Sequence, residues 1–368
     1  MAALRNKNSS PRFAEYCAQH TLFGSKPLVV FDVGARGGFA SYWNIFKDQE
    51  LLVGFEADAE DCRLMRDTYG DARHLFYPVI LGRAKESKKL YNTEYAPSAG
   101  LYEPDITYLG RFLNGSEMRV AGTAEVETID LDSFLASEQF AHTIDFLKVD
   151  VEGADLDVLE GAEHALEHVL GVSVEAEFLP VHKGQAVFSD IDMFLRKTGF
   201  SLYDMTLYRN PRACLPDMNK ARHPNPTRKG QVALAQALYF RDPIADTLRS
   251  PDSEAGRWNK TRILKLASLF EIFSLNDCAA ELIDHFSGRG MFAESDANRY
   301  RDLLVPPVRG KFLHYHEYLA LRDFFLAHGY FDGIGRLQKF GRLAKSFGVR
   351  ILPSRVRASA KQVVSRFL

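Results

Sequence analysis

The chain has 368 residues, of which 46% are hydrophobic and 26% charged, and its formal net charge is −2. This composition is that of a soluble globular protein long enough for two domains, and the near-balanced charge gives no indication of nucleic-acid binding. No apolar run approaches the ~20 residues of a membrane-spanning helix. The four cysteines are scattered without a C-x-x-C pair, and the polar N-terminus lacks a signal-peptide pattern. Both features predict a cytoplasmic protein with reduced thiols.

The first predicted strand, residues 28–33, carries Asp32 at its carboxyl end and is followed by the glycine-rich stretch "VGARGGFA". A buried parallel strand reads as a continuous apolar run. The glycines at positions 34, 37 and 38 allow a tight turn and a close approach of the backbone to a ligand. With a helix opening over 39–46, this is the usual place for a nucleotide-like ligand in an open α/β sheet. An ordinary strand-to-helix turn is the alternative.

The second predicted strand, residues 51–56, also ends in an acid, Glu56, and a helix follows over 59–69 with Asp58 as its cap. An acid at this place can accept hydrogen bonds from both ribose hydroxyls. The loop lacks the G-x-G-x-x-G order of dinucleotide sites and opens with a carboxylate, Asp32, which suits an ammonium group. Asp32 and Glu56 together therefore favour S-adenosylmethionine over NAD as the ligand. Two acids that merely end strands are the alternative.

The third and fourth predicted strands span 74–81 and 143–153, a helix follows over 154–170, and the fifth strand spans 171–178. Charged residues alternate along the fourth strand, so Lys148, Asp150 and Glu152 share one side.

The fifth strand carries Glu175 and Glu177, and His182 follows it. We expect Glu175 to pair with Lys148. Because parallel strands end at one edge of a sheet, we expect Asp150, Glu177 and His182 to converge there as catalytic residues. His182 could remove a proton from an alcohol, or Asp150 and Glu177 could hold Mg²⁺. A surface-loop histidine is the alternative for His182.

The rest of the chain contains a predicted helix over 191–197, strands over 200–209 and 232–240, and an irregular loop between them that is either a lid or a surface excursion. Residues 258–330 have helical periodicity, which predicts domains over 1–243 and 244–368. Residues 333–368 contain nine basic and no acidic residues. This tail is either a solvated helix or an amphipathic element that contacts an anionic membrane or a partner.

Four segments resemble the FkbM family of S-adenosylmethionine-dependent methyltransferases: "FDVGARGGFA", "LVGFEADAEDCRLM", "ETIDLDSFL" and, most specifically, "IDFLKVDVEGADLDVLEGA". The resemblance covers about residues 29–205. It implies a class I methyltransferase (Rossmann-like) fold, a seven-stranded, mostly parallel sheet with helices on both faces. It also implies methylation of hydroxyls on sugars or polyketide-like products. Asp32, Gly34 and Glu56 match the family's cofactor positions, and Asp150, Glu152 and Gly153 match its fourth-strand signature.

Arg36 stands where the family usually has asparagine, which could add an ion pair to the methionine carboxylate of the cofactor. The full predicted cofactor set is Asp32, Gly34, Ala35, Arg36, Gly37, Gly38, Glu56 and Ala57. The expected activity is O-methylation of a sugar hydroxyl in polysaccharide or glycoconjugate biosynthesis. A polyketide, lipid or peptide acceptor and a non-catalytic cofactor-binding module are the alternatives. We expect a cytoplasmic protein, with peripheral contact at the inner membrane face as the alternative.

Overall fold

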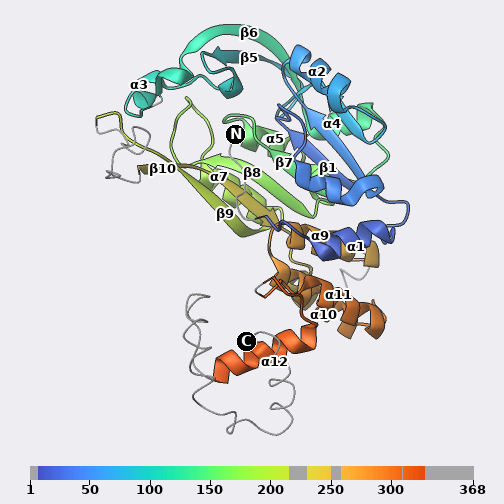
Figure 1. Ribbon diagram of the computed structural model, residues 1–368. Coiled ribbons are helices and arrows are strands. Elements are labelled where there is room, and N and C mark those ends of the chain that lie inside the picture. The colour runs from blue at the N-terminus through green and yellow to red at the C-terminus, as the bar shows by residue number, and fades with distance from the viewer. Residues whose placement is uncertain (1–6, 114, 215–229, 250–257, 309, 328–368) are drawn as a thin grey trace.

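The computed structural model describes residues 7–113, 115–214, 230–249, 258–308 and 310–327 (Figure 1). Its centre is a seven-stranded sheet with the order β3-β2-β1-β7-β8-β10-β9. β10 is antiparallel to both of its neighbours, and the other pairs are parallel. The strands are β1 (Leu28–Val33), β2 (Glu50–Phe55), β3 (His74–Tyr77), β7 (Phe146–Val149), β8 (Gly171–Glu177), β9 (Ser201–Asn210) and β10 (Gln231–Phe240). The predicted fold class is confirmed.

Helices cover both faces of this sheet, because the central strands are apolar on both sides; every residue of β1, β2 and β8 is buried. Leu28 and Val30 of β1 face one hydrophobic cluster, whereas Val29, Phe31 and Val33 face the other. The first cluster is closed by α1 (Arg12–Gln19), the 3₁₀ segment η1 (Ser41–Gln49) and α9 (Lys260–Ile272). The second is closed by α4 (Leu131–Ser137), α5 (Asp155–Glu160), α6 (Glu163–Leu166) and α7 (Phe188–Lys197).

Four predicted elements differ from the observed ones. The strand expected over 143–153 is only β7, Phe146–Val149, so that Asp150 and Glu152 lie in the turn after it and not on one side of a strand. The helix expected over 39–46 is the 3₁₀ segment η1, which begins at Ser41. The helix expected over 154–170 is broken into α5 and α6 at Gly161, where a Cβ atom would lie 2.1 Å from the carbonyl oxygen of Gly82. The strand expected over 74–81 splits after β3, and its end, β4 (Ile80–Leu81), joins a second sheet. α2 (Ala59–Tyr69), capped by Asp58, is as predicted.

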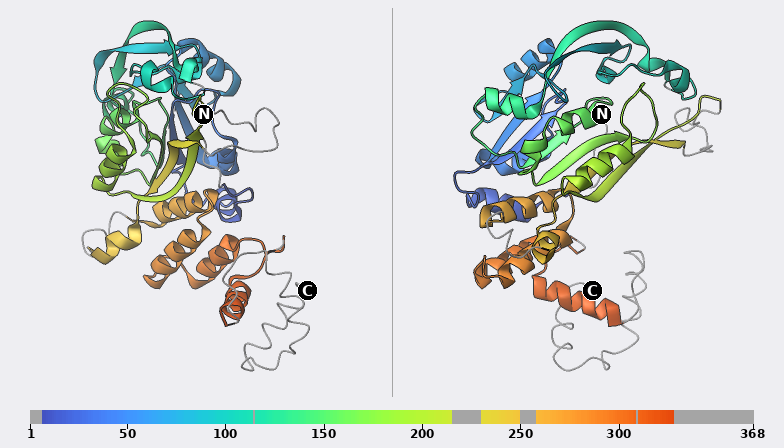
Figure 2. Two further views of the ribbon diagram at one scale, coloured as in Figure 1. Left: turned by 90° about the vertical axis from the view of Figure 1, so that its left-hand side faces the viewer. Right: turned by 180° about the vertical axis from the view of Figure 1, so that it is seen from behind.

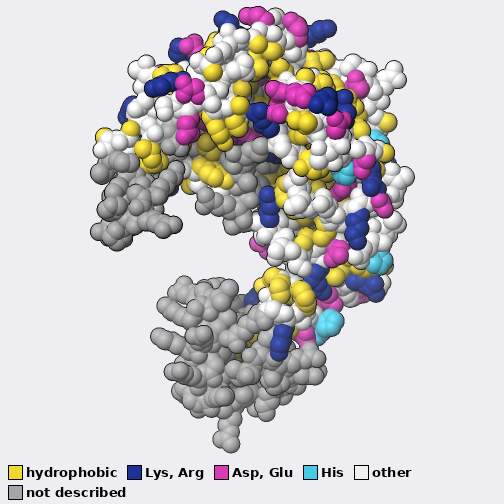
Figure 3. All heavy atoms as spheres, turned by 45° about the horizontal axis from the view of Figure 1, so that its top comes forward, with side chains coloured by type: hydrophobic (Ala, Val, Ile, Leu, Met, Phe, Trp, Pro, Cys, Tyr) yellow, Lys and Arg dark blue, Asp and Glu magenta, His cyan; other side chains and the backbone are white. Residues whose placement is uncertain are grey.

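A cap, defined here as residues 86–129, covers the carboxyl ends of the sheet strands and has no counterpart in the sequence analysis. Its strands β5 (Glu86–Thr93) and β6 (Val120–Ile129) pair antiparallel and form the second sheet with β4. They arch over the central sheet in Figures 1 and 2. Between them lie η2 (Ala96–Ser98), α3 (Ile106–Leu109) and η3 (Gly115–Met118). The face that carries the cap shows interspersed basic and acidic side chains (Figure 3).

The C-terminal helices begin with α9, whose residues Ile263–Ile272 are all buried, so that it belongs to the core of the sheet domain. Lys265 of α9 lies 2.6 Å from Asp145, which precedes β7. Farther from the sheet follow α10 (Asn276–Gly288), α11 (Glu294–Leu304) and α12 (Tyr315–Ala327), while α8 (Pro243–Arg249) precedes α9 (Figures 1 and 2). The packing of α9 against the sheet therefore crosses the predicted domain boundary at residue 243. The division into two domains stays a prediction.

Two further predictions concern residues outside this description: most of the irregular loop, at 215–229, and the basic tail, at 333–368. Among the helices that the structure describes, none has the length and apolar character needed to cross a membrane.

Candidate functional site

The loop after β1 is held against the end of β2 by its own backbone. The amides of Gly34 and Ala35 both donate to the carbonyl of Phe55, at 3.0 and 2.9 Å. Gly34 has a φ of 84°, and a Cβ atom on it would lie 2.0 Å from the carbonyl oxygen of Asp150. Only glycine tolerates both the conformation and the contact. The loop therefore brings the ends of β1, β2 and β7 together.

Asp32, the acid before this loop, is ion-paired inside the protein. Lys148 Nζ lies 2.7 Å from Asp32 Oδ1 and 3.6 Å from Asp150 Oδ2. Burial lowers the pKa of Lys148, but the carboxylates of Asp32 and Asp150 outweigh burial and raise it, so that the ammonium stays charged. Lys148 thus pairs with Asp32 and Asp150, and the predicted pairing with Glu175 is wrong. The strand register explains this, because Asp32 and Lys148 are direct neighbours on β1 and β7.

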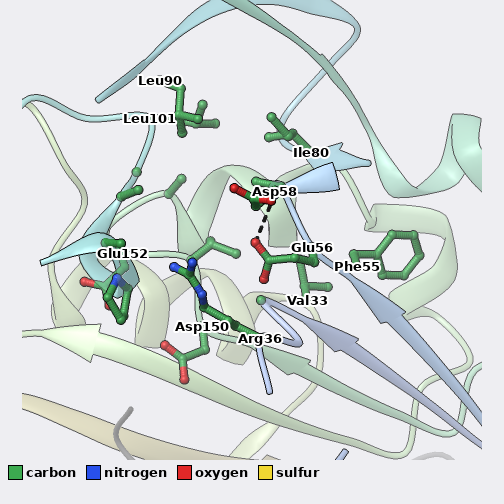
Figure 4. Close-up of a pocket in the computed structure, with 18 of the residues that line it drawn as sticks. Val33, Arg36, Phe55, Glu56, Asp58, Ile80, Leu90, Leu101, Asp150 and Glu152 are labelled. Atoms are coloured by element: carbon green, nitrogen blue, oxygen red, sulfur yellow. Dashed lines mark hydrogen bonds between the residues drawn. The ribbon is translucent and has the colours of Figure 1, made fainter. Parts of the chain in front are cut away.

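Glu56 directly follows β2, and its buried carboxylate accepts a hydrogen bond from the amide of Asp58 at 3.0 Å. Burial raises the pKa of Glu56, whereas this hydrogen bond and the charge of Arg36 lower it in part. Arg36 extends into the same cavity (Figure 4) and is already paired with Asp61 at 2.5 Å. A cofactor carboxylate at Arg36 would therefore compete with Asp61.

A cavity of about 410 Å³ lies at the carboxyl ends of β1, β2 and β7, beneath the cap (Figure 4). The predicted site residues that line it are Gly34, Arg36, Glu56, Ala57 and Asp150. Those that are not among its lining residues are Asp32, Ala35, Gly37, Gly38, Glu177 and His182. The cavity therefore unites five of the eleven predicted site residues, and Asp150 is the single predicted catalytic residue among those that line it.

Buried acids surround the end of β7 and the neighbouring end of β8. Burial, together with the charges of Asp150 and Asp155, raises the pKa of Glu152 to about 8. Burial and Asp150 likewise raise the pKa of Asp155 to about 7, although Asp155 accepts hydrogen bonds from the amides of Val151 and Gly153. Burial also raises the pKa values of Glu175 and Glu177 well above the ordinary range. Burial and mutual repulsion therefore disfavour the ionised forms of these acids, and Lys148 is the cation at the border of the group.

His182 is buried beside this group, and a Cβ atom on Gly153 would lie 2.9 Å from its Nδ1. Nδ1 lies 2.7 Å from Gln185 Oε1, an acceptor, so Nδ1 carries the proton and Nε2 the lone pair. Burial lowers the pKa of His182. Nε2 has no hydrogen-bond partner within the described part of the chain. His182 is therefore a buried neutral imidazole, not a surface histidine.

The sequence analysis missed the cap side of the cavity. The lining residues contributed by the cap are Leu90, Asn92, Thr93, Tyr95, Ala96, Pro97, Ala99, Gly100 and Leu101. The strands of the cap, β5 and β6, are largely exposed and contain no continuous apolar run. The content of β-branched residues in "VAGTAEVETI" was a signal for a strand here, although they do not alternate along it.

A comparison with protein families matches residues 32–202 to the family described as the methyltransferase FkbM domain. No curated protein sequence matches the chain.

Among solved structures, the chain is similar to a magnesium protoporphyrin IX methyltransferase from Synechocystis with bound S-adenosylmethionine. The identity is 11%, the match covers 62% of this chain and 78% of that one, and the TM-score is 0.30. A precorrin-6y C5,15-methyltransferase from Geobacter metallireducens is 9% identical, with 66% and 94% coverage and a TM-score of 0.32. The fold assignment rests on the strand order of the sheet.

Proposed function

Residues 32–202 of this chain form a methyltransferase FkbM domain, and we propose that the protein transfers a methyl group from S-adenosylmethionine to a hydroxyl group of an acceptor. The observation that carries the proposal is the meeting of Gly34, Glu56 and Asp150 around one cavity at the carboxyl ends of β1, β2 and β7. Ligands of open α/β sheets bind at this edge.

The residues present fit S-adenosylmethionine, which supplies an electrophilic methyl group on a sulfonium. The cavity volume of about 410 Å³ lies within the roughly 300–1,000 Å³ typical of small-molecule sites. Glu56 would accept hydrogen bonds from the ribose hydroxyls, and Ile80 and Leu81 offer an apolar wall for the adenine. Asp32 does not face the cavity. Its partner Lys148 lies 3.4 Å from the carbonyl of Gly34, so Asp32 fixes the loop through that lysine.

We propose that Asp150 or His182 takes the proton from the acceptor hydroxyl. Glu177 is the third residue of the predicted catalytic group. His182 has the chemistry of a base, because its imidazole is neutral and its Nε2 lone pair is free of hydrogen bonds within the described residues. Asp150 has the better position, because it faces the cavity. For His182 to act, the acceptor must come within reach of Nε2, because His182 packs against Gly153 and is not among the residues that line the cavity.

The proposed acceptor is a sugar hydroxyl in polysaccharide or glycoconjugate assembly, in the cytoplasm. The cap supports this choice, because Asn92 and Thr93 offer polar groups and the half-exposed ring of Tyr95 offers an aromatic surface. A polyketide, a lipid or a peptide is the second acceptor class. A non-catalytic cofactor-binding module would keep the same cavity without turnover.

The test is transfer of label from tritium-labelled S-adenosylmethionine to a panel of nucleotide sugars, lipid-linked glycans, polyketides and peptides. Labelling of a sugar acceptor is the expected result. Asp150→Asn or His182→Ala should then lower turnover by about 10²–10⁴-fold, the usual contribution of a general base, while binding of S-adenosylhomocysteine persists. Glu103→Gln, at an exposed acid of the cap, is the matched control.

EDTA separates the two predicted routes for the proton. Inhibition that Mg²⁺ reverses supports metal activation, for which the sequence predicts Asp150 and Glu177 as ligands, whereas indifference to EDTA supports the His182 base. If no acceptor in the panel is labelled although the cofactor binds, the non-catalytic alternative replaces the proposal.

A further inference from the structure

The residue that orients His182 is Gln185, and a tight turn brings the two side chains together. Lys183 and Gly184 form the turn, and Gly184 has a φ of 76°, which glycine adopts without strain. The side-chain oxygen of Gln185 lies 2.5 Å from the backbone amide of His182 and 2.7 Å from Nδ1 of its imidazole. One side chain thus holds both the main chain and the ring of His182.

These contacts fix which nitrogen of His182 carries the proton. A backbone amide can only donate, so the end of the Gln185 side chain that faces it must be the oxygen. The other end agrees, since its nitrogen lies 3.4 Å from the carbonyl oxygen of Ala186, which can only accept. Nδ1 must then donate to the Gln185 oxygen, and in the neutral ring Nε2 is left with a lone pair.

The cap restrains the main chain of the same loop. Pro104 of the cap pairs with His182 as an isolated antiparallel bridge. The amide of Asp105 donates to the carbonyl of Val181, the residue before His182, at 2.9 Å. Backbone contacts from the cap therefore hold the loop in place, while Gln185 holds the ring.

The imidazole lies behind the wall of the cavity. It packs against Gly153, whose chain neighbours Glu152 and Ala154 both line the cavity. His182 is only 2% exposed, and Nε2 has no hydrogen-bond donor within the described part of the chain. Because a buried acceptor without a donor is unfavourable, Nε2 is suited to a hydroxyl that arrives with a ligand.

We propose that Gln185 is a positioning residue, which holds His182 in the Nδ1–H form so that Nε2 accepts the proton of the acceptor hydroxyl. This inference rests on the proposed function, and it selects His182 over Asp150 as the base. Asp150 is the weaker candidate, because its Oδ2 atom already faces the ammonium of Lys148 at 3.6 Å. No acid or cation has to move for Nε2 to accept a proton.

The role of Gln185 continues through the transfer. The O–H bond of the acceptor breaks, and its proton binds Nε2 of His182. The oxygen uses the electron pair to bond the methyl carbon, and the electron pair of the broken carbon–sulfur bond stays on the sulfur. The imidazolium that results keeps its Nδ1–H on the Gln185 oxygen, which stabilises the charged ring.

The first test observes the tautomer directly, by two-bond ¹H–¹⁵N NMR of full-length protein labelled with ¹⁵N-histidine. The signals of His182 are those missing from His182→Asn, and at about pH 8 the ring is neutral. We expect Nδ1 to carry the proton in the wild-type protein. Gln185→Leu removes the acceptor and should lose this pattern, whereas Gln185→Glu keeps an oxygen at the same reach and should retain it.

The second test is turnover on the acceptor that the wild-type protein labels. Gln185→Leu should lower turnover about tenfold or more, because a histidine in the wrong tautomer does not act as the base. The KM for the acceptor and the affinity for S-adenosylhomocysteine should stay unchanged, and Gln185→Glu should recover most of the loss. Gln19→Leu, the same change at an exposed glutamine of α1, is the matched control. Circular dichroism checks folding, and Gln185→Met replaces Gln185→Leu if the latter does not fold.

Three results would overturn the positioning role: an Nε2–H form of His182 in the wild-type protein, an unchanged Nδ1–H form in folded Gln185→Leu, or a changed tautomer in that variant with unchanged turnover. The first of these needs no variant and no substrate. If the wild-type protein has the Nδ1–H form but labels no acceptor, the proposed function fails, while the spectra of the variants still decide whether Gln185 sets the tautomer.

Discussion

At the scale of single residues, the ion pair between Lys148 and Asp32 joins β7 to β1 directly beneath the glycine loop. Both side chains are mostly buried, and Lys148 also reaches the carbonyl of Gly34 at 3.4 Å. Removal of the lysine would leave the carboxylate of Asp32 buried without its partner. One lysine therefore holds two strand ends and the loop in the arrangement that the cavity requires.

We predict that Lys148→Met lowers the free energy of unfolding by about 3–5 kcal/mol, the usual effect of removing one member of a buried ion pair. Urea denaturation measures this. Lys88→Met, which removes an exposed pair with Glu86, should cost less than about 1 kcal/mol. Adding Asp32→Asn to Lys148→Met should restore part of the loss. Equal stability of Lys148→Met and wild type would contradict this account of the pair.

The acids of the site could be predicted from the sequence, but not all of the residues that pair with them. Glu56 was found because it ends an apolar strand, and it does face the cavity. Asp32 was found in the same way, yet its carboxylate is occupied by Lys148. Parity along one strand shows which side chains share a side, whereas the register between strands decides which acid the lysine meets, and register is not visible in one sequence.

At the scale of elements, the apolar strands could be predicted, since a strand buried on both faces reads as a continuous hydrophobic run. The cap could not, because β5 and β6 are largely exposed and contain no continuous apolar run. The break between α5 and α6 could not be predicted either, because it depends on the close approach of Gly161 to Gly82, which lie far apart in the sequence.

The N-terminus of α1 depends on α9 for its hydrogen bonds. Glu271 of α9 accepts from the amides of Phe13 and Ala14, at 3.1 and 2.8 Å, and is fully buried. Burial raises the pKa of Glu271 to about 7, and these hydrogen bonds lower it only in part. Because its folded pKa exceeds its unfolded value, this group stabilises the fold fully below pH ~4.5, and the contribution is lost as pH rises towards 7.

We therefore predict that wild type exceeds Glu271→Gln in stability by more at pH 5 than at pH 7.5. The difference between the two pH values should be roughly 2 kcal/mol, from the shift in pKa. Urea denaturation at each pH measures it. Glu294→Gln, at an exposed acid in the first turn of α11, should show no such dependence. A stability difference for Glu271→Gln that is equal at both pH values would contradict the raised pKa.

At the scale of the whole molecule, the basic tail lies outside the described residues, and its role rests on the sequence. Nine basic and no acidic residues stand between Gly333 and Leu368, interleaved with apolar ones. Each basic group close to an anionic membrane contributes about 1 kcal/mol, screened within a Debye length of roughly 8 Å.

We predict that the full-length protein co-sediments with anionic liposomes at low salt and is released at high salt. A chain that ends at Asp332 should stay in the supernatant, and neutral liposomes serve as the control. If both forms remain in solution at every salt concentration, the tail does not contact membranes. The acceptor would then be a soluble nucleotide sugar or a small glycan rather than a lipid-linked one.

The central claim is that the cavity at the ends of β1, β2 and β7 binds S-adenosylmethionine, with Glu56 on the ribose. Calorimetric titration of the full-length protein with S-adenosylhomocysteine tests it most directly. We predict one site per chain, with binding weakened by about 1–3 kcal/mol in Glu56→Ala through the lost hydrogen bonds and unchanged in Glu60→Ala on the exposed side of α2. No saturable binding to the wild-type protein, or equal affinity of wild type and Glu56→Ala, would contradict the claim.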